Sequence, residues 1–210
     1  AHPEDCTIRT FADDVLRLVA NVADGPAVLV GHSMGGRVVL QAAAARPDLT
    51  AGVVLVDGSR VATDAEQVQR NLAALDANGD FAASQRRIFE TMFLATSPSE
   101  IRRRVIERAV AMDEAVVRAQ IRSLMAWDAF EFPTAVADIT APILAVQSTF
   151  VDADLRRLPL SPDSTSPYVE DVRQYAPALT SVVVPGTGHF SMLEAPDAIT
   201  AAIEEFLRRL

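Results

Sequence analysis

The sequence contains no lysine, so all 19 of its basic residues are arginines. Acidic residues number 28, and the formal net charge at pH 7 is -9. A surface that binds nucleic acid needs a basic face, so this excess of acid argues against a nucleic-acid partner. A phosphate-binding loop that ends in Gly-Lys-Ser or Gly-Lys-Thr is excluded as well, because it requires a lysine.

Cysteine is nearly absent too. Cys6 is the single cysteine, which excludes an internal disulfide and favours a reducing compartment. No apolar run approaches the ~20 residues that a membrane-spanning helix needs. The first residues, AHPEDCTIRT, are polar and do not read as a signal peptide. We therefore expect a cytoplasmic location and no membrane partner.

The 210 residues are 50% hydrophobic, which is typical of a globular domain with a sizeable core. Short apolar runs have the pattern of strands that are covered on both faces of a sheet. These runs are AVLVG (27–31), AGVVLVDG (51–58), PILAVQS (142–148) and SVVVPG (181–186). A helix capped by Thr10 precedes them, and helical patterns separate and follow them. This order predicts an α/β fold with a mostly parallel sheet flanked by helices.

Residues 63–135 are too long for a simple crossover between two strands. The segment has about 70 residues and several helical patterns, whereas a crossover needs only about 10–15. We interpret it as an inserted helical cap, or lid, with residues 1–62 and 136–210 forming the core. Residues 156–167 are rich in proline and serine and predict a loop, with a helix starting at Ser166-Pro167.

The stretch VLVGHSMGGRVVL (28–40) passes from a strand through a glycine-rich corner into a helix. Gly31-His32-Ser33-Met34-Gly35 fits the pattern G-x-S-x-G, in which strained backbone lifts the serine hydroxyl clear of the sheet. Bulkier residues at positions 31 and 35 should clash with the adjacent strand and helix. A dinucleotide-binding loop would need a second glycine where Ser33 stands. The corner therefore predicts Ser33 as a nucleophile.

A serine nucleophile needs a base, and the sequence has three histidines, His2, His32 and His189. His2 lies at the beginning of the chain. His32 adjoins Ser33, so its side chain should point away from the serine and pack around the corner. His189 lies on a glycine-rich loop after the last predicted strand, at the carboxyl edge where α/β proteins place their sites. We predict His189 as general base and then general acid.

Taken together, GHSMGG, PGTGHFSMLEAPD and the 63–135 insert make the chain resemble the α/β-hydrolase family over residues 10–210. The resemblance implies a nucleophile elbow, a Ser-acid-His catalytic triad, an acyl-enzyme intermediate, no metal and no cofactor. It also implies that the backbone N–H of Met34 is one oxyanion-hole donor. Relatives carry about four strands and a second donor ahead of the elbow strand. No such strands precede AVLVG, so we expect the N-terminal strands to be missing from this sequence.

The resemblance leaves two positions open for the acid. Most relatives place it after the strand that precedes the histidine strand, where this chain reads VQSTFVDADLRR. That turn lacks a glycine, and Asp152 and Asp154 come late in it. A minority place the acid at the end of the strand after the nucleophile helix, which is Asp57 here. We favour Asp57 and retain Asp152; either carboxylate could hold the imidazole tautomer.

The resulting functional hypothesis is a serine esterase-like hydrolase that cleaves an ester, thioester or lactone of a small apolar substrate. Phe93, Trp127 and Phe130 of the cap are candidate substrate contacts, although each could belong to the core of the cap. Carbon–carbon bond hydrolysis and cofactor-free perhydrolysis use the same triad and remain alternatives. A ligand receptor with slow turnover is a further alternative. The expected partner is a small molecule, and the chain could form a homodimer.

Overall fold

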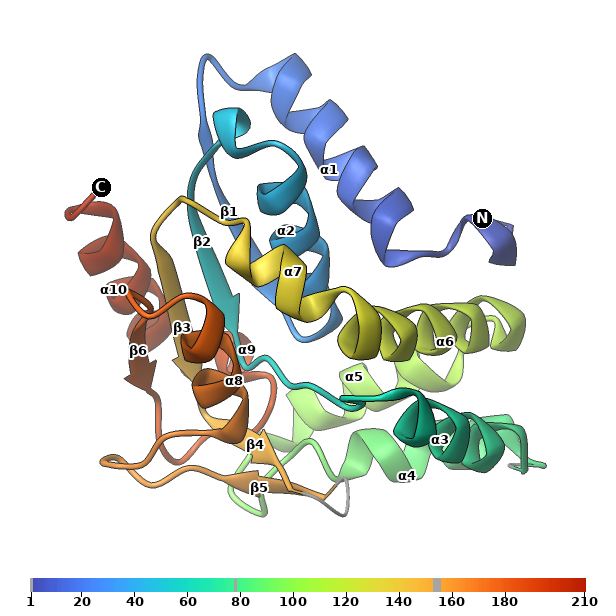
Figure 1. Ribbon diagram of the computed structural model, residues 1–210. Helices are drawn as coiled ribbons and strands as arrows, with labels where there is room; N and C mark the ends of the chain where they lie inside the picture. The colour runs from blue at the N-terminus through green and yellow to red at the C-terminus, as the bar shows by residue number, and fades with distance from the viewer. Residues whose placement is uncertain (1, 78, 153–155) are drawn as a thin grey trace.

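The computed structural model describes residues 2–77, 79–152 and 156–210 (Figure 1). Within them, the main sheet is parallel, and its strands lie in the order β1-β2-β3-β6. The strands are β1 (Ala27–His32), β2 (Thr50–Val56), β3 (Ile143–Gln147) and β6 (Thr180–Val183). They overlap the four apolar runs of the sequence, so the predicted parallel α/β sheet is confirmed. β6 lacks the expected cover on both faces, because Thr180, Ser181 and Val182 are exposed.

The described α-helices cover the sheet and build the insert. They are α1 (Ile8–Val22), α2 (Met34–Ala45), α3 (Ala65–Ala77), α4 (Phe81–Glu90), α5 (Ser99–Val110), α6 (Glu114–Phe130), α7 (Phe132–Ala137), α8 (Pro167–Tyr175), α9 (Ser191–Glu194) and α10 (Pro196–Leu207). Short 3-10 turns cover Pro3–Asp5 and Pro47–Leu49. The expected cap at Thr10 is wrong, because the Thr7 hydroxyl accepts the Thr10 N–H at 3.0 Å and α1 starts earlier.

Successive residues of β2 face opposite sides of the sheet, as the pleat requires. Val53 and Leu55 pack into a core formed with α1, α2, α7 and α8. Val54 and Val56 pack on the other side, against Ile199 and Phe206; these lie on α10, on the opposite side of the strands from α2 and α7 in Figure 1. The run VVLV is therefore buried on both faces, which explains why it shows no apolar–polar alternation.

The predicted central position of AVLVG is not seen among the described residues. There β1 pairs with β2 and occupies an edge of the sheet, as β6 does at the other edge. Consequently the Val30 side chain is 51% exposed, whereas Leu29 on the other face is buried. An apolar run of five residues thus indicates a strand but does not fix its place in the sheet.

The insert forms the helices α3 to α7, and in Figure 1 α3 to α6 gather beyond the carboxyl ends of the strands. Its last part is continuous with the core. Trp127 near the end of α6, and Phe132 and Val136 on α7, belong to the same buried cluster as α2. The polypeptide therefore returns to the core before residue 135.

Part of the predicted loop 156–167 is a strand. β5 (Arg157–Pro159) pairs antiparallel with β4 (Thr149–Val151), directly after β3. Additional hydrogen bonds close this hairpin: the Asp152 N–H donates to the Arg156 carbonyl and the Leu160 N–H to the Ser148 carbonyl, both at 2.9 Å. Leu160 is buried and anchors the hairpin to the protein. The predicted helix start at Ser166 is confirmed, because its hydroxyl accepts the Val169 N–H at 3.1 Å.

Candidate active site

Ser33 lies between the end of β1 and the start of α2, in a backbone conformation that side chains rarely adopt. Its φ is 54° and its ψ is -118°. Such a conformation costs on the order of 1–3 kcal/mol and persists only where the surroundings impose it. Here the Ser33 N–H donates to the Val56 carbonyl at 3.1 Å, and the Ser33 carbonyl accepts the Gly36 N–H at 3.0 Å. The corner thus has the geometry expected of a nucleophile elbow.

The two glycines of the motif differ in how much space their surroundings leave for a side chain. A Cβ at Gly31 would lie 2.3 Å from the carbonyl oxygen of Gly35, whereas a Cβ at Gly35 would meet nothing within 4 Å. Position 31 therefore requires glycine because α2 passes directly over it. The expected clash at position 35 is wrong.

Gly31→Ala is expected to lower the free energy of unfolding by about 3 kcal/mol, because the backbone of the corner must move to admit the methyl group. Gly35→Ala is the matched control, and alanine is the better helix former, so stability should stay the same or rise slightly. Urea unfolding of the two variants checks the difference. Equal midpoints would show that the close approach at Gly31 does not constrain the corner.

His189 follows β6 on the glycine-rich loop and is almost completely buried, with 1% of its surface exposed. Its Nδ1 lies 2.6 Å from Oδ2 of Asp57. Its backbone N–H donates to the carbonyl of Met92, between α4 and α5, at 2.8 Å. A carboxylate on Nδ1 fixes the tautomer that carries hydrogen there and leaves Nε2 able to accept a proton.

Asp57 follows β2 directly and also has a positive φ, of 47°. Its Oδ1 accepts the N–H of Ser148 at 2.8 Å, the Ser148 hydroxyl at 3.0 Å and the Thr149 N–H at 2.8 Å. Its Oδ2 accepts the Thr149 hydroxyl at 2.5 Å besides His189. Burial alone would raise the pKa of this carboxyl, but the hydrogen bond to His189 and nearby positive charge lower it below its usual value. Asp57 is therefore an anion at neutral pH.

Burial of His189 favours a neutral ring. Burial lowers the pKa of the imidazole to about 3, the hydrogen bond to Asp57 opposes that shift, and Arg157 and His32 reinforce it. Near pH 7 the ring is thus uncharged and can take a proton from a hydroxyl group. Within the described residues no hydrogen bond joins the Ser33 hydroxyl to His189, and such bonds often tighten only when substrate binds.

The second predicted acid lies elsewhere. The Asp152 carboxylate accepts the Arg156 N–H and its guanidinium Nε, each at 2.9 Å, at the turn end of the β4–β5 hairpin. Asp154 lies outside the described residues. The structure therefore brings Asp57 to the imidazole and places Asp152 in an ion pair with Arg156.

Met34 begins α2, so its backbone N–H belongs to the first turn of a 12-residue helix. The first N–H groups of a helix have no partner within the helix, and they carry the positive end of its dipole. Because Met34 directly follows Ser33, this N–H lies beside the candidate nucleophile. Its position suits a donor to a developing oxyanion.

The three aromatic residues predicted to contact substrate lie in different places. Phe93 stacks on Phe190, with ring centroids 5.2 Å apart, next to His189. Trp127 is buried in the core, where its indole N–H donates to Gln41 at 2.8 Å. Phe130 is 60% exposed near Ala44 and Ala45, at the opposite end of α2 from Ser33. Phe93 alone of the three adjoins the candidate site.

Phe190 and His32 border the candidate site and were not predicted to do so. The His32 ring packs against the candidate base, with its centroid 4.5 Å from that of His189. Its Nε2 is 2.8 Å from the His189 carbonyl oxygen. Phe190 packs 5.3 Å from both histidine rings. Their sequence positions, each adjacent to a predicted catalytic residue, were the available signal.

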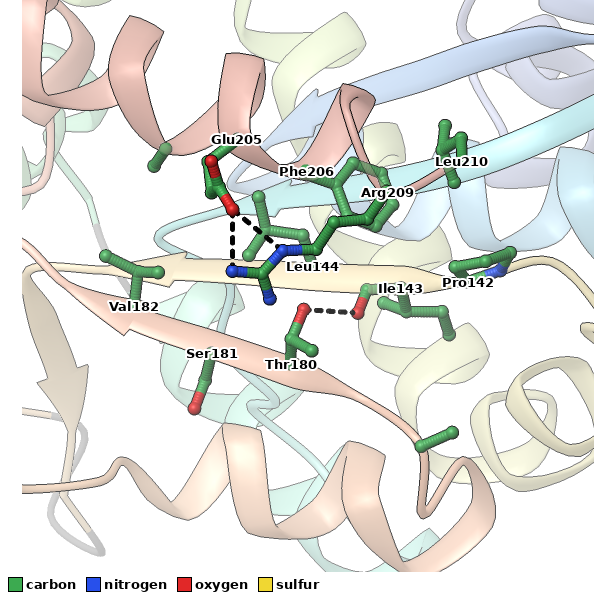
Figure 2. A pocket seen from close by; sticks show the side chains of 12 residues that line it. Pro142, Ile143, Leu144, Thr180, Ser181, Val182, Glu205, Phe206, Arg209 and Leu210 are labelled. Carbon is green, nitrogen blue, oxygen red and sulfur yellow. Dashed lines mark hydrogen bonds and ion pairs between the residues drawn. The ribbon is translucent and has the colours of Figure 1, made fainter.

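The cavity in Figure 2 is separate from this site. It has a volume of about 380 Å³ and lies between β3, β6 and α10. Ile143 and Thr180, which line it, begin β3 and β6, whereas Asp57 and His189 lie beyond the carboxyl ends of strands. Arg209 pairs with Glu205 there, as Figure 2 shows. Ligand sites of parallel α/β sheets form at the carboxyl edge, so we do not assign this cavity to the active site.

Residues 2–77, 79–152 and 156–210 contain neither a metal-binding cluster nor a membrane-spanning helix. No three histidine, cysteine, aspartate or glutamate side chains converge there in an arrangement that could hold a metal ion. No helix in those parts of the chain combines the length and the apolar character that crossing a bilayer would take.

Residues 2–202 match the sequence model of the alpha/beta hydrolase family. The chain is 43% identical to lipase LipV of Mycobacterium tuberculosis over 75 residues, which cover 36% of this chain and 28% of that protein. It is 29% identical to 2-(acetamidomethylene)succinate hydrolase of Mesorhizobium japonicum over 94% of this chain and 69% of that protein. The fold resembles the solved enol-lactonase of Burkholderia xenovorans, with a TM-score of 0.71, 20% identity and coverage of 96% of this chain and 73% of that one.

Proposed function

Because the chain belongs to the alpha/beta hydrolase family, we propose that it is a serine hydrolase that cleaves an ester, thioester or lactone through an acyl-enzyme. The observation that carries the proposal is the 2.6 Å contact between His189 Nδ1 and Asp57, at the edge where the strained Ser33 lies. His32 at the end of β1 pairs in register with Val56 at the end of β2, so Ser33 and Asp57 leave neighbouring strands side by side.

In this mechanism the Ser33 hydroxyl oxygen attacks the substrate carbonyl carbon while His189 Nε2 takes the hydroxyl proton. The Asp57 carboxylate stabilises the imidazolium that forms, and the Met34 N–H donates to the carbonyl oxygen as it becomes an anion. The imidazolium then gives its proton to the leaving oxygen or sulfur. Water attacks the acyl-serine with His189 again as base, which releases the acid and restores Ser33.

We propose a small and mostly apolar substrate, because the side chains that adjoin the two histidines are aromatic. Phe93 and Phe89 both stack on Phe190, with centroids 5.2 and 6.3 Å apart. These stacked aromatic side chains favour contact with an acyl or alkyl group, and they carry no charge that could bind an ionic group. The curated relatives named as a lipase and as a hydrolase of an acetamidomethylene succinate support hydrolysis of carboxylic acid derivatives.

Ser33→Ala is expected to abolish labelling by a fluorophosphonate probe and to reduce hydrolysis of short p-nitrophenyl esters to background, because the attacking oxygen is removed. Ser181→Ala, which changes a serine at the outer edge of β6, is the matched control and should label at the wild-type rate. Labelling that survives in Ser33→Ala would refute the proposed nucleophile. Wild-type labelling without turnover on an ester, thioester and lactone panel would instead favour a slow-turnover receptor.

A further inference from the structure

Arg157 is a buried cation next to the candidate acid, and the mechanism above does not use it. It lies on β5 with 9% of its side chain exposed. Its Nη1 donates to the Thr149 hydroxyl at 2.7 Å and to Asp57 Oδ2 at 3.3 Å. Burying a guanidinium is unfavourable unless it is paired, and a Ser-His-Asp triad needs no cation on its acid. The burial of Arg157 beside Asp57 is therefore not explained by the mechanism alone.

We propose that Arg157 is a positioning residue for the Asp57–His189 pair: through Thr149 it fixes the Asp57 carboxylate, and it sets the charge that the imidazole meets. This inference rests on the proposed function, since it assigns Asp57 and His189 as acid and base. It adds a residue 100 positions from the acid along the chain, as the Arg157–Asp57 contact records.

The direction of the hydrogen bonds supports the positioning role. Arginine can only donate, so the Thr149 oxygen accepts from Nη1, and its own hydrogen is then directed to Asp57 Oδ2. Thr149 is on β4 and Arg157 on β5, in one hairpin. Together with the backbone N–H of Thr149, this hairpin holds both carboxylate oxygens, so Asp57 cannot turn away from His189 without breaking several bonds.

The charge has a separate consequence for the base. The groups that face His189 are Asp57 after β2, Arg157 on β5 and His32 on β1. Burial is the largest cause of the low pKa of His189; among the charged groups, the Asp57 hydrogen bond raises this pKa, while Arg157 and His32 lower it. Removing the Arg157 charge should therefore raise the pKa of His189. Because the base must be neutral, the loss of activity on acidification should then begin at a higher pH.

The test is the pH dependence of the fluorophosphonate labelling rate, measured from about pH 2 to about pH 8, a range that includes the low pKa of the His189 ring. The acid limb of this profile is the fall in labelling rate on acidification. Arg157→Gln should move the midpoint of the acid limb to a pH about one unit higher, and Arg157→Lys, which keeps the charge, should leave it close to the wild-type position. Arg156→Gln is the matched control, because this neighbouring arginine pairs with Asp152 and should not affect the limb. A limb that does not move in Arg157→Gln would overturn the proposal, and so would an equal shift in Arg156→Gln.

A second measurement separates this inference from the proposed function. NMR titration of the His189 ring, in a Ser33→Ala background without substrate, reports its pKa directly and requires no turnover. Arg157→Gln should raise that pKa, whether or not Ser33 proves to be the nucleophile. If Arg157→Gln fails to fold, Arg157→Met and Arg157→Lys take its place: the pKa should rise with methionine and not with lysine, and any other result would overturn the inference.

Discussion

Asp57→Asn is expected to lower kcat by about 10⁴-fold, the size of effect that a wrong histidine tautomer produces in serine proteases. Asparagine has one acceptor oxygen where Asp57 has two. The backbone N–H groups of Ser148 and Thr149 both point at Oδ1, so the amide oxygen should take that place. The amide NH₂ then faces His189 Nδ1, which must accept, and the ring hydrogen moves to Nε2. A ring protonated on Nε2 cannot take the Ser33 proton.

The measurement is kcat on the best ester of the panel, with the folded state checked by circular dichroism. Asp152→Asn is the matched control, and it should keep wild-type activity because its partner is Arg156. The reverse pattern, an inactive Asp152→Asn and an active Asp57→Asn, would move the acid to the β4–β5 hairpin and contradict the assignment.

Asp128→Ala is expected to lower the free energy of unfolding by about 3–5 kcal/mol, the largest effect on stability that we predict. Arg37 and Asp128 form a buried pair, with side chains 4% and 1% exposed, and make two hydrogen bonds of 2.7 Å. Arg37 also donates to the Ser59 carbonyl at 2.6 Å, and Asp128 accepts the Val61 N–H at 2.8 Å. Alanine would leave the guanidinium buried without its counter-ion. Urea unfolding measures the change.

Two further variants make this measurement specific. Asp48→Ala breaks an exposed pair with Arg46 and should not change the unfolding midpoint measurably. The double variant Arg37→Met/Asp128→Leu removes both charges and should be more stable than Asp128→Ala. If Asp128→Ala were as stable as Asp48→Ala, the pair would not hold α2 to α6. A double variant less stable than Asp128→Ala would show that packing, rather than the unpaired charge, sets the cost.

The local features of this chain could be predicted from its sequence. The strand, corner and helix around Ser33 are encoded by neighbouring residues, whereas the preference for Asp57 over Asp152 came from the resemblance to the α/β-hydrolase family. The start of α1 was misplaced because Thr7 and Thr10 can both cap a helix, and their hydroxyls lie 2.8 Å apart. Propensity cannot distinguish two such candidates three residues apart.

The long-range features could not be predicted in this way. Trp127 lies on a helix with apolar residues on more than one side, and packing against α2 decided that it belongs to the core. The hairpin strand at Arg157 is short and contains a proline, so it lacks the alternation that marks a strand. The contact of Arg157 with Asp57 depends on how that hairpin packs at the carboxyl end of β2, which no local pattern specifies.

Two hydrogen bonds limit how the loop that carries the base can move. The His189 amide is held by the Met92 carbonyl, and the hydroxyl of Ser97 donates to Glu194 at 2.6 Å. Both bonds fasten the same stretch between α4 and α5 to the segment 188–194. That stretch cannot swing outward as a gate without pulling on the imidazole. An opening that admits substrate without displacing His189 must therefore occur elsewhere around the candidate active site.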